Sequence, residues 1–146
     1  MGLIENIEGT IICVDTAPFI YFIEKNSKYF KLMKSIFSKI EDEKIDAVTS
    51  TITLLEVLVL PLRLKKIDLA EQYRDILLNT DGLITCEISH PISELAANLR
   101  AKYLIRTPDS IQLATGIIHG AETFITNDLA LKKINEIKII VLDDYI

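Results

Sequence analysis

The sequence is poor in the residues that build zinc sites, disulfides and catalytic triads. It has only two cysteines, Cys13 and Cys86, and two histidines among 146 residues. No Cys-x-x-Cys or Cys/His spacing occurs, and both cysteines sit in apolar, strand-like runs, where we expect small buried hydrophobes. Neither His90 nor His119 has the partners of a triad, and there is no glycine-rich phosphate loop. Acidic residues are therefore the main candidates for any chemistry.

Long uninterrupted apolar runs are also missing. No basic segment precedes an apolar stretch at the amino end, and the run from Ile11 to Ile23 is broken by Asp15 and Pro18. We therefore expect no signal peptide, no membrane span and a cytoplasmic protein. Internal repeats, low-complexity segments and linkers are absent as well, so we interpret residues 1–146 as one domain, long enough to bury a core.

Positive charge is not in excess. The formal net charge is −5 and the sequence pI is about 5.0, which excludes a generally basic protein that coats nucleic acid but does not test for local patches. Hydrophobic residues make up 49% and the mean hydropathy is +0.30, which is high for a soluble monomer. We expect some of this apolar surface to meet another protein, as in a homodimer.

Strand patterns alternate with helical patterns along the chain. Short β-branched runs predict strands, and apolar residues at helical spacing predict the helices between them. Gly82 and Gly120 each end a helix, and Thr107 is predicted to cap the helix that Pro108 begins. This alternation predicts an α/β fold, a three-layer α/β/α sandwich with a mostly parallel sheet. The predicted strands are 10–14, 46–49, 83–88, 123–126 and 138–142, and the predicted helices are 16–24, 28–40, 51–61, 68–78, 91–103, 107–120 and a short one at 127–134.

Four acidic residues fall where strands and helices meet. Asp15 and Asp128 follow predicted strands, and Asp109 lies in the first turn of a helix. Glu56 lies about one turn into the helix after the second strand. Loops at the carboxyl ends of parallel strands converge on one crevice, so residues far apart in sequence become neighbours there. We therefore predict one acidic pocket formed by all four residues.

Each of the four also has a plainer interpretation. Asp15 and Asp128 can be helix caps, and the helix dipole favours Asp109 near a helix amino terminus. The helix that carries Glu56 is apolar on every side. If this helix is buried on every side, the Glu56 carboxylate needs cations or hydrogen-bond donors. If not, Glu56 occupies the one solvent-facing stripe of the helix. Helical periodicity leaves both possibilities open. The sheet edge shared by all four favours a common site.

Carboxylates that share a pocket repel one another. Two unit charges about 4 Å apart cost roughly 4 kcal/mol at an effective dielectric of 20. A divalent cation removes this repulsion, and oxygen ligands without histidine or cysteine favour Mg²⁺ or Mn²⁺. One or two such ions lower the pKa of a bound water, orient it for in-line attack and stabilise a leaving phosphodiester oxygen. The pocket therefore predicts nuclease chemistry without a protein nucleophile.

Four motifs carry the acids in order along the chain. They are Val14-Asp15-Thr16, Leu54-Leu55-Glu56-Val57, Thr107-Pro108-Asp109-Ser110 and Thr126-Asn127-Asp128. Their order and spacing resemble, nearly end to end, those of the PIN-domain nucleases, and specifically the VapC-like toxins of toxin–antitoxin pairs. The resemblance implies a Rossmann-like α/β/α sandwich and a Mg²⁺- or Mn²⁺-dependent endoribonuclease. It also implies homodimerisation and inhibition by a small antitoxin protein.

The resemblance also assigns roles to single residues. It implies that Asp15, Glu56, Asp109 and Asp128 are catalytic metal ligands and that the Thr126 hydroxyl supports the site. Thr16 is a further candidate for such support.

Other functions stay open beside the toxin. The family contains stand-alone nucleases of RNA processing, and a non-catalytic PIN-like protein-interaction module is a further alternative. A phosphohydrolase with Asp15 as nucleophile is disfavoured, because that chemistry usually needs a second aspartate two residues on, where Ala17 stands.

Basic and aromatic residues gather in three places. The two basic groups can guide RNA phosphates, but solvated helix ends explain them at least as well. The aromatic residues fall at helical spacing, which favours core or dimer packing over base stacking. The basic groups are Arg63, Lys65 and Lys66, and Arg100, Lys102 and Arg106; the aromatic residues are Phe19, Tyr21, Phe22, Tyr29, Phe30 and Phe37.

Overall fold

Five short strands form one sheet at the centre of the molecule. The computed structural model describes residues 2–146 and orders the strands β3-β2-β1-β4-β5, with every neighbouring pair parallel. The predicted sheet is therefore confirmed, and it is parallel throughout. The strands are β1 (Ile11–Val14), β2 (Asp46–Ser50), β3 (Leu83–Cys86), β4 (Thr123–Thr126) and β5 (Lys138–Val141).

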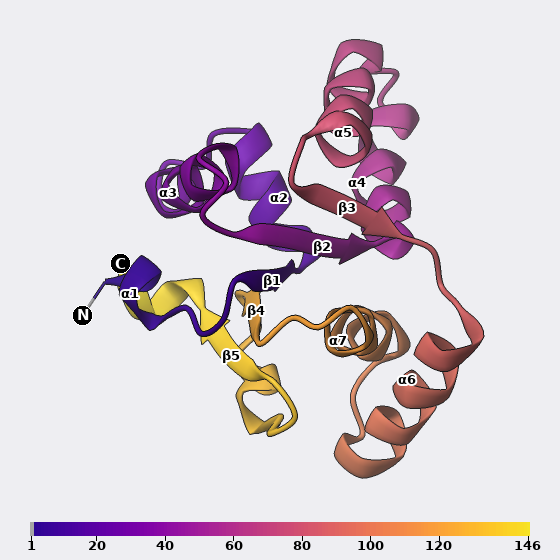
Figure 1. Cartoon of the computed structure of the whole chain (residues 1–146). Coiled ribbons are helices and arrows are strands. Elements are labelled where there is room, and N and C mark those ends of the chain that lie inside the picture. Colours follow the sequence, from indigo (N-terminus) through magenta and orange to yellow (C-terminus); the bar gives the residue numbers. More distant parts are fainter. Residues whose placement is uncertain (1) are drawn as a thin grey trace.

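Helices cover both faces of this sheet, which confirms the three-layer sandwich (Figure 1). One face carries α1 (Leu3–Asn6), α2 (Thr16–Ile23), α3 (Phe30–Glu41), α4 (Thr51–Arg63) and α5 (Ile67–Asn79). The other face carries α6 (His90–Tyr103) and α7 (Thr107–Ile118). Two short 3-10 helices complete the chain, η1 (Leu129–Lys133) and η2 (Leu142–Tyr145).

Burial of the strands on both sides follows from this layering. Ile12 and Val14 of β1 pack into one core, whereas Cys13 between them packs into the other. Successive side chains of a strand point to opposite faces, so a strand covered on both sides is apolar throughout. Cys13 and Cys86 are free and buried, as predicted. No helix among residues 2–146 is long and apolar enough to cross a membrane.

The sheet order reverses beside β1. The chain passes from β1 to β2 and β3 on one side, and later to β4 and β5 on the other. The backbone N–H of Asp15 donates to the carbonyl of Ile125 at 2.9 Å, which extends the contact between β1 and β4 past the end of β1. In open α/β sheets, ligands bind at the carboxyl ends of the strands where the order reverses. Asp15 lies at that point.

Three local predictions differ from the structure. Thr107 is the first residue of α7 and does not cap it, because its hydroxyl accepts from Arg100 Nη1 at 2.9 Å and Arg106 occupies the cap position. Helix α4 continues through Pro61 to Arg63, and burial of the proline ring offsets the hydrogen bond that proline removes. The short helix predicted at 127–134 is the 3-10 turn η1.

Candidate active site

All four predicted carboxylates line one cavity of about 440 Å³. The cavity opens at the carboxyl edge of the sheet, where β1 and β4 end and α4 and α7 begin. The four acids come from four segments that are far apart along the chain. The other residues that line the cavity are Thr16, Ala17, Ile20, Tyr21, Arg106, Thr126 and Asn127.

Thr126 joins two of the acids. Its hydroxyl donates to Oδ2 of Asp15 at 2.8 Å and accepts from the backbone N–H of Asp128 at 3.1 Å. Asp15 also accepts from the N–H of Thr16 at 2.8 Å, and Asp128 accepts from the N–H of Ala130 at 2.9 Å. Both aspartates are therefore helix caps as well as cavity residues. Capping fixes each carboxylate at its strand end and leaves oxygen lone pairs free.

Asp15 carries the clearest electrostatic perturbation of the site. Burial raises its pKa from 3.8 to about 6, and the nearby charges of Asp109 and Glu56 add to the rise. The hydrogen bonds from Thr126 and Thr16 act in the opposite direction but do not cancel it. Negative charge at this strand end is therefore incompletely compensated by the protein.

Glu56 lies on the exposed side of α4. The Thr16 hydroxyl donates to its Oε1 at 2.6 Å. Of the two possibilities left open by periodicity, the solvent-facing stripe is the one observed, because α4 is not buried all round. Its exposed surface is largely apolar, with Leu55, Val59, Leu60 and Leu62 each more than 40% exposed.

Asp109 is nearly buried and is paired with a neighbouring cation. Nε of Arg106 lies 3.1 Å from its Oδ2, and Nη2 lies 3.4 Å from its Oδ1. The side chain of Asp109 is 10% exposed, and that of Arg106 is 77% exposed. A two-pronged contact of this kind fixes the plane of the carboxylate.

A buried polar network beneath the cavity was not predicted from the sequence. Gln112 of α7 accepts from the backbone N–H of Ser50 at 3.2 Å and donates to Thr16 Oγ1 at 3.3 Å. Its amide also donates to Thr53, whose hydroxyl contacts Thr49 at 2.8 Å. The amide thus holds β2, α2, α4 and α7 together behind Glu56. Its one sequence signal is a polar residue on an otherwise apolar stretch of helix.

The residues fit a hard divalent cation by chemistry. Four carboxylates line the cavity, and no histidine or cysteine does so among the described residues. No three Asp, Glu, His or Cys side chains within residues 2–146 are gathered closely enough to hold an ion as they stand. Arg106 binds both oxygens of Asp109, and the Thr16 hydroxyl binds one oxygen of Glu56. An ion therefore competes with internal partners.

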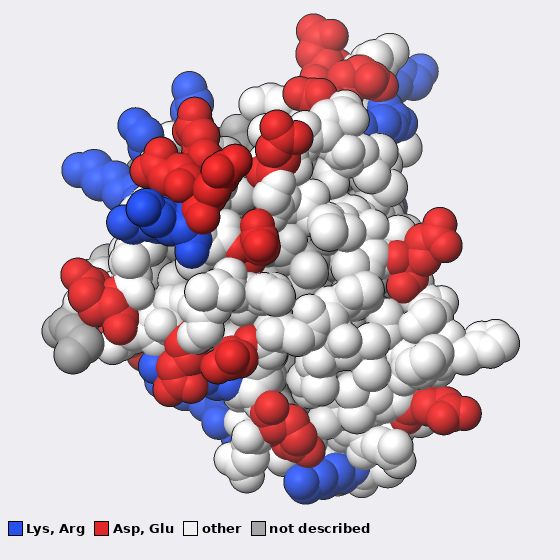
Figure 2. Space-filling view, in the orientation of Figure 1, with Lys and Arg blue, Asp and Glu red and all other residues white. Residues whose placement is uncertain are grey.

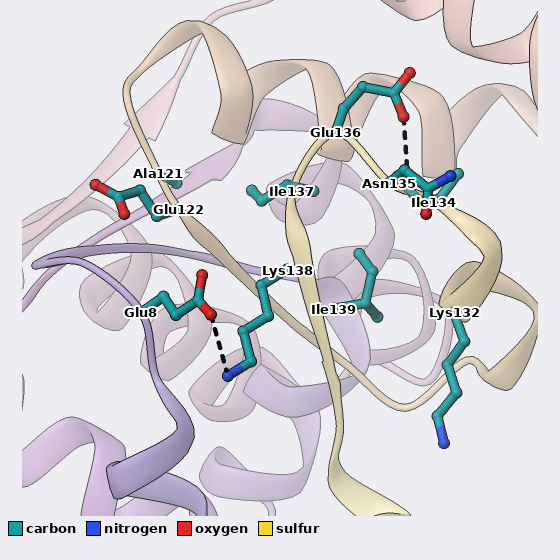
Figure 3. A pocket seen from close by; sticks show the side chains of 10 residues that line it. All are labelled: Glu8, Ala121, Glu122, Lys132, Ile134, Asn135, Glu136, Ile137, Lys138 and Ile139. Carbon is teal, nitrogen blue, oxygen red and sulfur yellow. Dashed lines mark hydrogen bonds and ion pairs between the residues drawn. The ribbon is translucent and has the colours of Figure 1, made fainter.

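A larger cavity, of about 690 Å³, lies at the opposite edge of the sheet (Figure 3). Two of its acids, Glu8 and Glu136, are each paired with a lysine. Lys138, which also lines the cavity, lies 3.7 Å from Glu8, and Lys102, which does not, lies 3.2 Å from Glu136. The smaller cavity is therefore the more acidic of the two, because four carboxylates line it, whereas lysines neutralise two of the acids of the larger one.

The other candidate residues fall into clear classes. Arg106 alone of the six basic candidates lines the acidic cavity, while Arg100 and Lys102 are used in contacts within the chain. On the face drawn in Figure 2, blue side chains gather over α3 with red ones among them, and a broad central area carries few charges.

The aromatic residues pack together, as predicted. Phe22 stacks on Phe37 at 4.0 Å and Tyr21 on Tyr29 at 4.3 Å between ring centroids.

Comparison with known families decides the identity of the fold. The family model described as "PIN domain" matches residues 12–137. The chain belongs to the PIN domain family. The matched segment contains all four cavity acids and strands β1 to β4, apart from the first residue of β1, and it ends just before β5. No curated protein matches the sequence of this PIN domain.

Solved structures of VapC-like proteins share the fold. One is VapBC2 from Rickettsia felis bound to a DNA fragment from its promoter, at 20% identity and a TM-score of 0.69, covering 90% of this chain and 98% of that one. A second is a toxin–antitoxin complex from Klebsiella pneumoniae, at 23% identity and 0.69, covering 90% and 97%. A third is VapBC-5 from Mycobacterium tuberculosis, at 20% identity and 0.60, covering 91% and 99%. At these identities the likeness establishes the fold.

Proposed function

We propose that this PIN domain is a metal-dependent endoribonuclease that cleaves RNA phosphodiesters with Asp15, Glu56, Asp109 and Asp128 as metal ligands. One observation carries the proposal: four acids from distant segments line one cavity at the point where the sheet order reverses. Membership of a family of nucleases and the oxygen-only donor set support it. We propose the cytoplasm as the place of this activity.

The chain's own residues supply position and charge. Bound Mg²⁺ or Mn²⁺, as one or two ions, supplies an activated water and stabilisation of the leaving oxygen. Thr126 orients Asp15 through its hydroxyl and holds the backbone of Asp128. The Thr16 hydroxyl orients Glu56 by donating to its carboxylate. These contacts are made before substrate arrives, so the acids need little reorganisation during the reaction.

Cleavage assays test the proposal directly. Purified protein is incubated with RNA in Mn²⁺, in Mg²⁺ and in chelator, beside the variants Asp15→Asn and Asp42→Asn. Asp42 is exposed outside the cavity, so its variant changes the net charge equally and serves as the matched control. We expect cleavage only with metal and only by the parent and the control. Equal cleavage by Asp15→Asn would overturn the proposal.

We further propose that the protein is the toxin of a type II pair and forms a homodimer. The solved neighbours include toxin–antitoxin complexes. Exposed apolar side chains continue from α4 into the start of α5, namely Leu55, Leu60, Leu62, Leu64 and Ile67, each more than 50% exposed. Exposed apolar side chains that gather on neighbouring helices are typical of a protein–protein contact surface. Light scattering at about 10 μM tests the dimer, since modest interfaces persist at that concentration; a monomer contradicts it.

Two alternatives give different results. A stand-alone nuclease cleaves RNA but binds no small protein encoded by the adjacent reading frame. Co-expression with that reading frame tests for such binding. A non-catalytic interaction module binds divalent ions weakly or not at all. Tight Mn²⁺ binding that is lost in Asp109→Asn excludes the module.

A further inference from the structure

The acidic cavity contains its own cation. Among the described residues that line it, Arg106 is the one with positive charge, facing four carboxylates. Its guanidinium is bound to both oxygens of Asp109, at 3.1 and 3.4 Å. Asp128 and Glu56 line the same cavity as Arg106. The guanidinium therefore lies in a pocket with further carboxylates besides that of its ion pair.

The backbone beneath Arg106 is fixed, whereas its head group is not. Arg100 clamps the residues on either side, donating from Nε to the Ile105 carbonyl and from Nη1 to the Thr107 hydroxyl, each at 2.9 Å. Ile105 is buried and Pro108 begins the next helix. The Arg106 side chain is 77% exposed, and among residues 2–146 its one hydrogen-bonding partner is Asp109. The backbone of Arg106 is thus held in place, whereas its guanidinium is released by any cation that binds Asp109 instead.

Guanidinium binds carboxylate and phosphate with the same fork of donors. We propose that Arg106 is an exchange cation of the site: it neutralises Asp109 until a divalent ion takes that carboxylate, and the freed guanidinium then binds a phosphate oxygen of the RNA. The inference rests on the proposed function, because it needs the metal and the RNA. In the described chain, Asp109 is thus the acid whose two oxygens an ion must take from another cation.

The exchange predicts that removing the Arg106 charge raises the affinity for the metal and lowers the affinity for RNA. In Arg106→Gln the metal no longer displaces a competing cation and no longer meets a like charge, so Mn²⁺ should bind about tenfold more tightly. The RNA loses a phosphate contact, so its KM should rise, and the slope of log KM against log salt should fall by about 0.7. A residue with a merely structural role would weaken both.

Calorimetric titration of the full-length protein with Mn²⁺ alone gives the first readout. Arg74→Gln is the matched control, because Arg74 forms an i,i+3 pair with Glu71 on α5 and does not line the cavity. We expect tighter Mn²⁺ binding by Arg106→Gln and unchanged binding by Arg74→Gln. Unchanged or weaker binding by Arg106→Gln overturns the exchange.

Steady-state RNA cleavage across a salt series gives the second readout. Arg106→Gln should show the raised KM and the shallower slope, and Arg106→Lys, which keeps the charge, should restore most of the slope. A slope that equals that of the parent overturns the inference. If the parent neither binds Mn²⁺ nor cleaves RNA, the proposed function itself has failed, so the two failures are distinguishable.

Discussion

Replacing Asp15 by asparagine should stabilise the metal-free protein while abolishing activity. Asparagine has nearly the same shape and is as good a helix cap, so the contact with the N–H of Thr16 survives. What disappears is a negative charge in a buried place beside Asp109 and Glu56. Sites of this kind are kept for function at the expense of stability.

The magnitude follows from the pKa of Asp15. Burial raises it from 3.8 to about 6, so the folded state holds the proton more tightly than the unfolded chain does. Because the pKa of Asp15 is higher in the folded state, this carboxyl lowers the free energy of unfolding of the protein as the pH rises from about 4 to about 6. Above about pH 6 the protein stays destabilised by the full amount. A pKa rise of that size corresponds to at most about 3 kcal/mol, or several degrees in Tm for a chain of this length.

Urea denaturation in chelator, at a series of pH values from 4 to 8, measures this effect. The parent and Asp15→Asn should be nearly equal in stability at pH 4, and the variant should become more stable as the pH rises to about 6. Asp42→Asn is the control and should follow the parent. A variant that is less stable than the parent at pH 8 would refute the reasoning. Added Mn²⁺ should stabilise the parent but not Asp15→Asn, through mass action.

Three further substitutions test the supports of the site and the packing beneath it. Thr126→Val removes the hydroxyl that donates to Asp15, so the pKa of Asp15 should rise further. The acid limb of the pH–activity profile should then move to higher pH, and an acid limb at the same pH as in the parent contradicts this. Gln112→Leu leaves the Ser50 N–H without its partner, and urea denaturation should show a loss of about 1–3 kcal/mol. Gly116→Ala should also lower the urea midpoint, because an added Cβ lies 2.7 Å from Cys13 Cβ in the packed core, and an unchanged midpoint would show that α7 can shift away from β1.

The fold was largely predictable because its signals are local. Strands buried on both faces are short apolar runs, and glycine or proline marks many of the boundaries, so the strand–helix alternation could be predicted from the sequence. Gly120, for example, has φ +83° at the end of α7, as its place in the sequence indicated. Errors arose where a tertiary contact decided the outcome. Thr107 was predicted as a cap from its own propensity, but Arg100 takes its hydroxyl.

The candidate site was predictable in part for a different reason. In a parallel sheet, topology brings the carboxyl ends of strands together, so Asp15 and Asp128 could be placed from strand positions alone. The exposure of Glu56 could not, because the apolar side of α4 faces outward, and helical periodicity does not say which side is covered. The Gln112 network depends on side-chain contacts among four elements, and the Arg106 pair depends on a contact between the cap residue and the first turn of α7. Neither leaves a distinctive pattern in the sequence.

Mn²⁺ has an anomalous X-ray signal, which makes a crystal grown with saturating Mn²⁺ the most direct test. The account predicts an anomalous peak in the cavity, with oxygens of Asp15 and Asp109 as ligands of the ion and the Arg106 guanidinium displaced from Asp109. A crystal of the folded protein without manganese in this cavity, and with the Arg106–Asp109 pair intact, would contradict it.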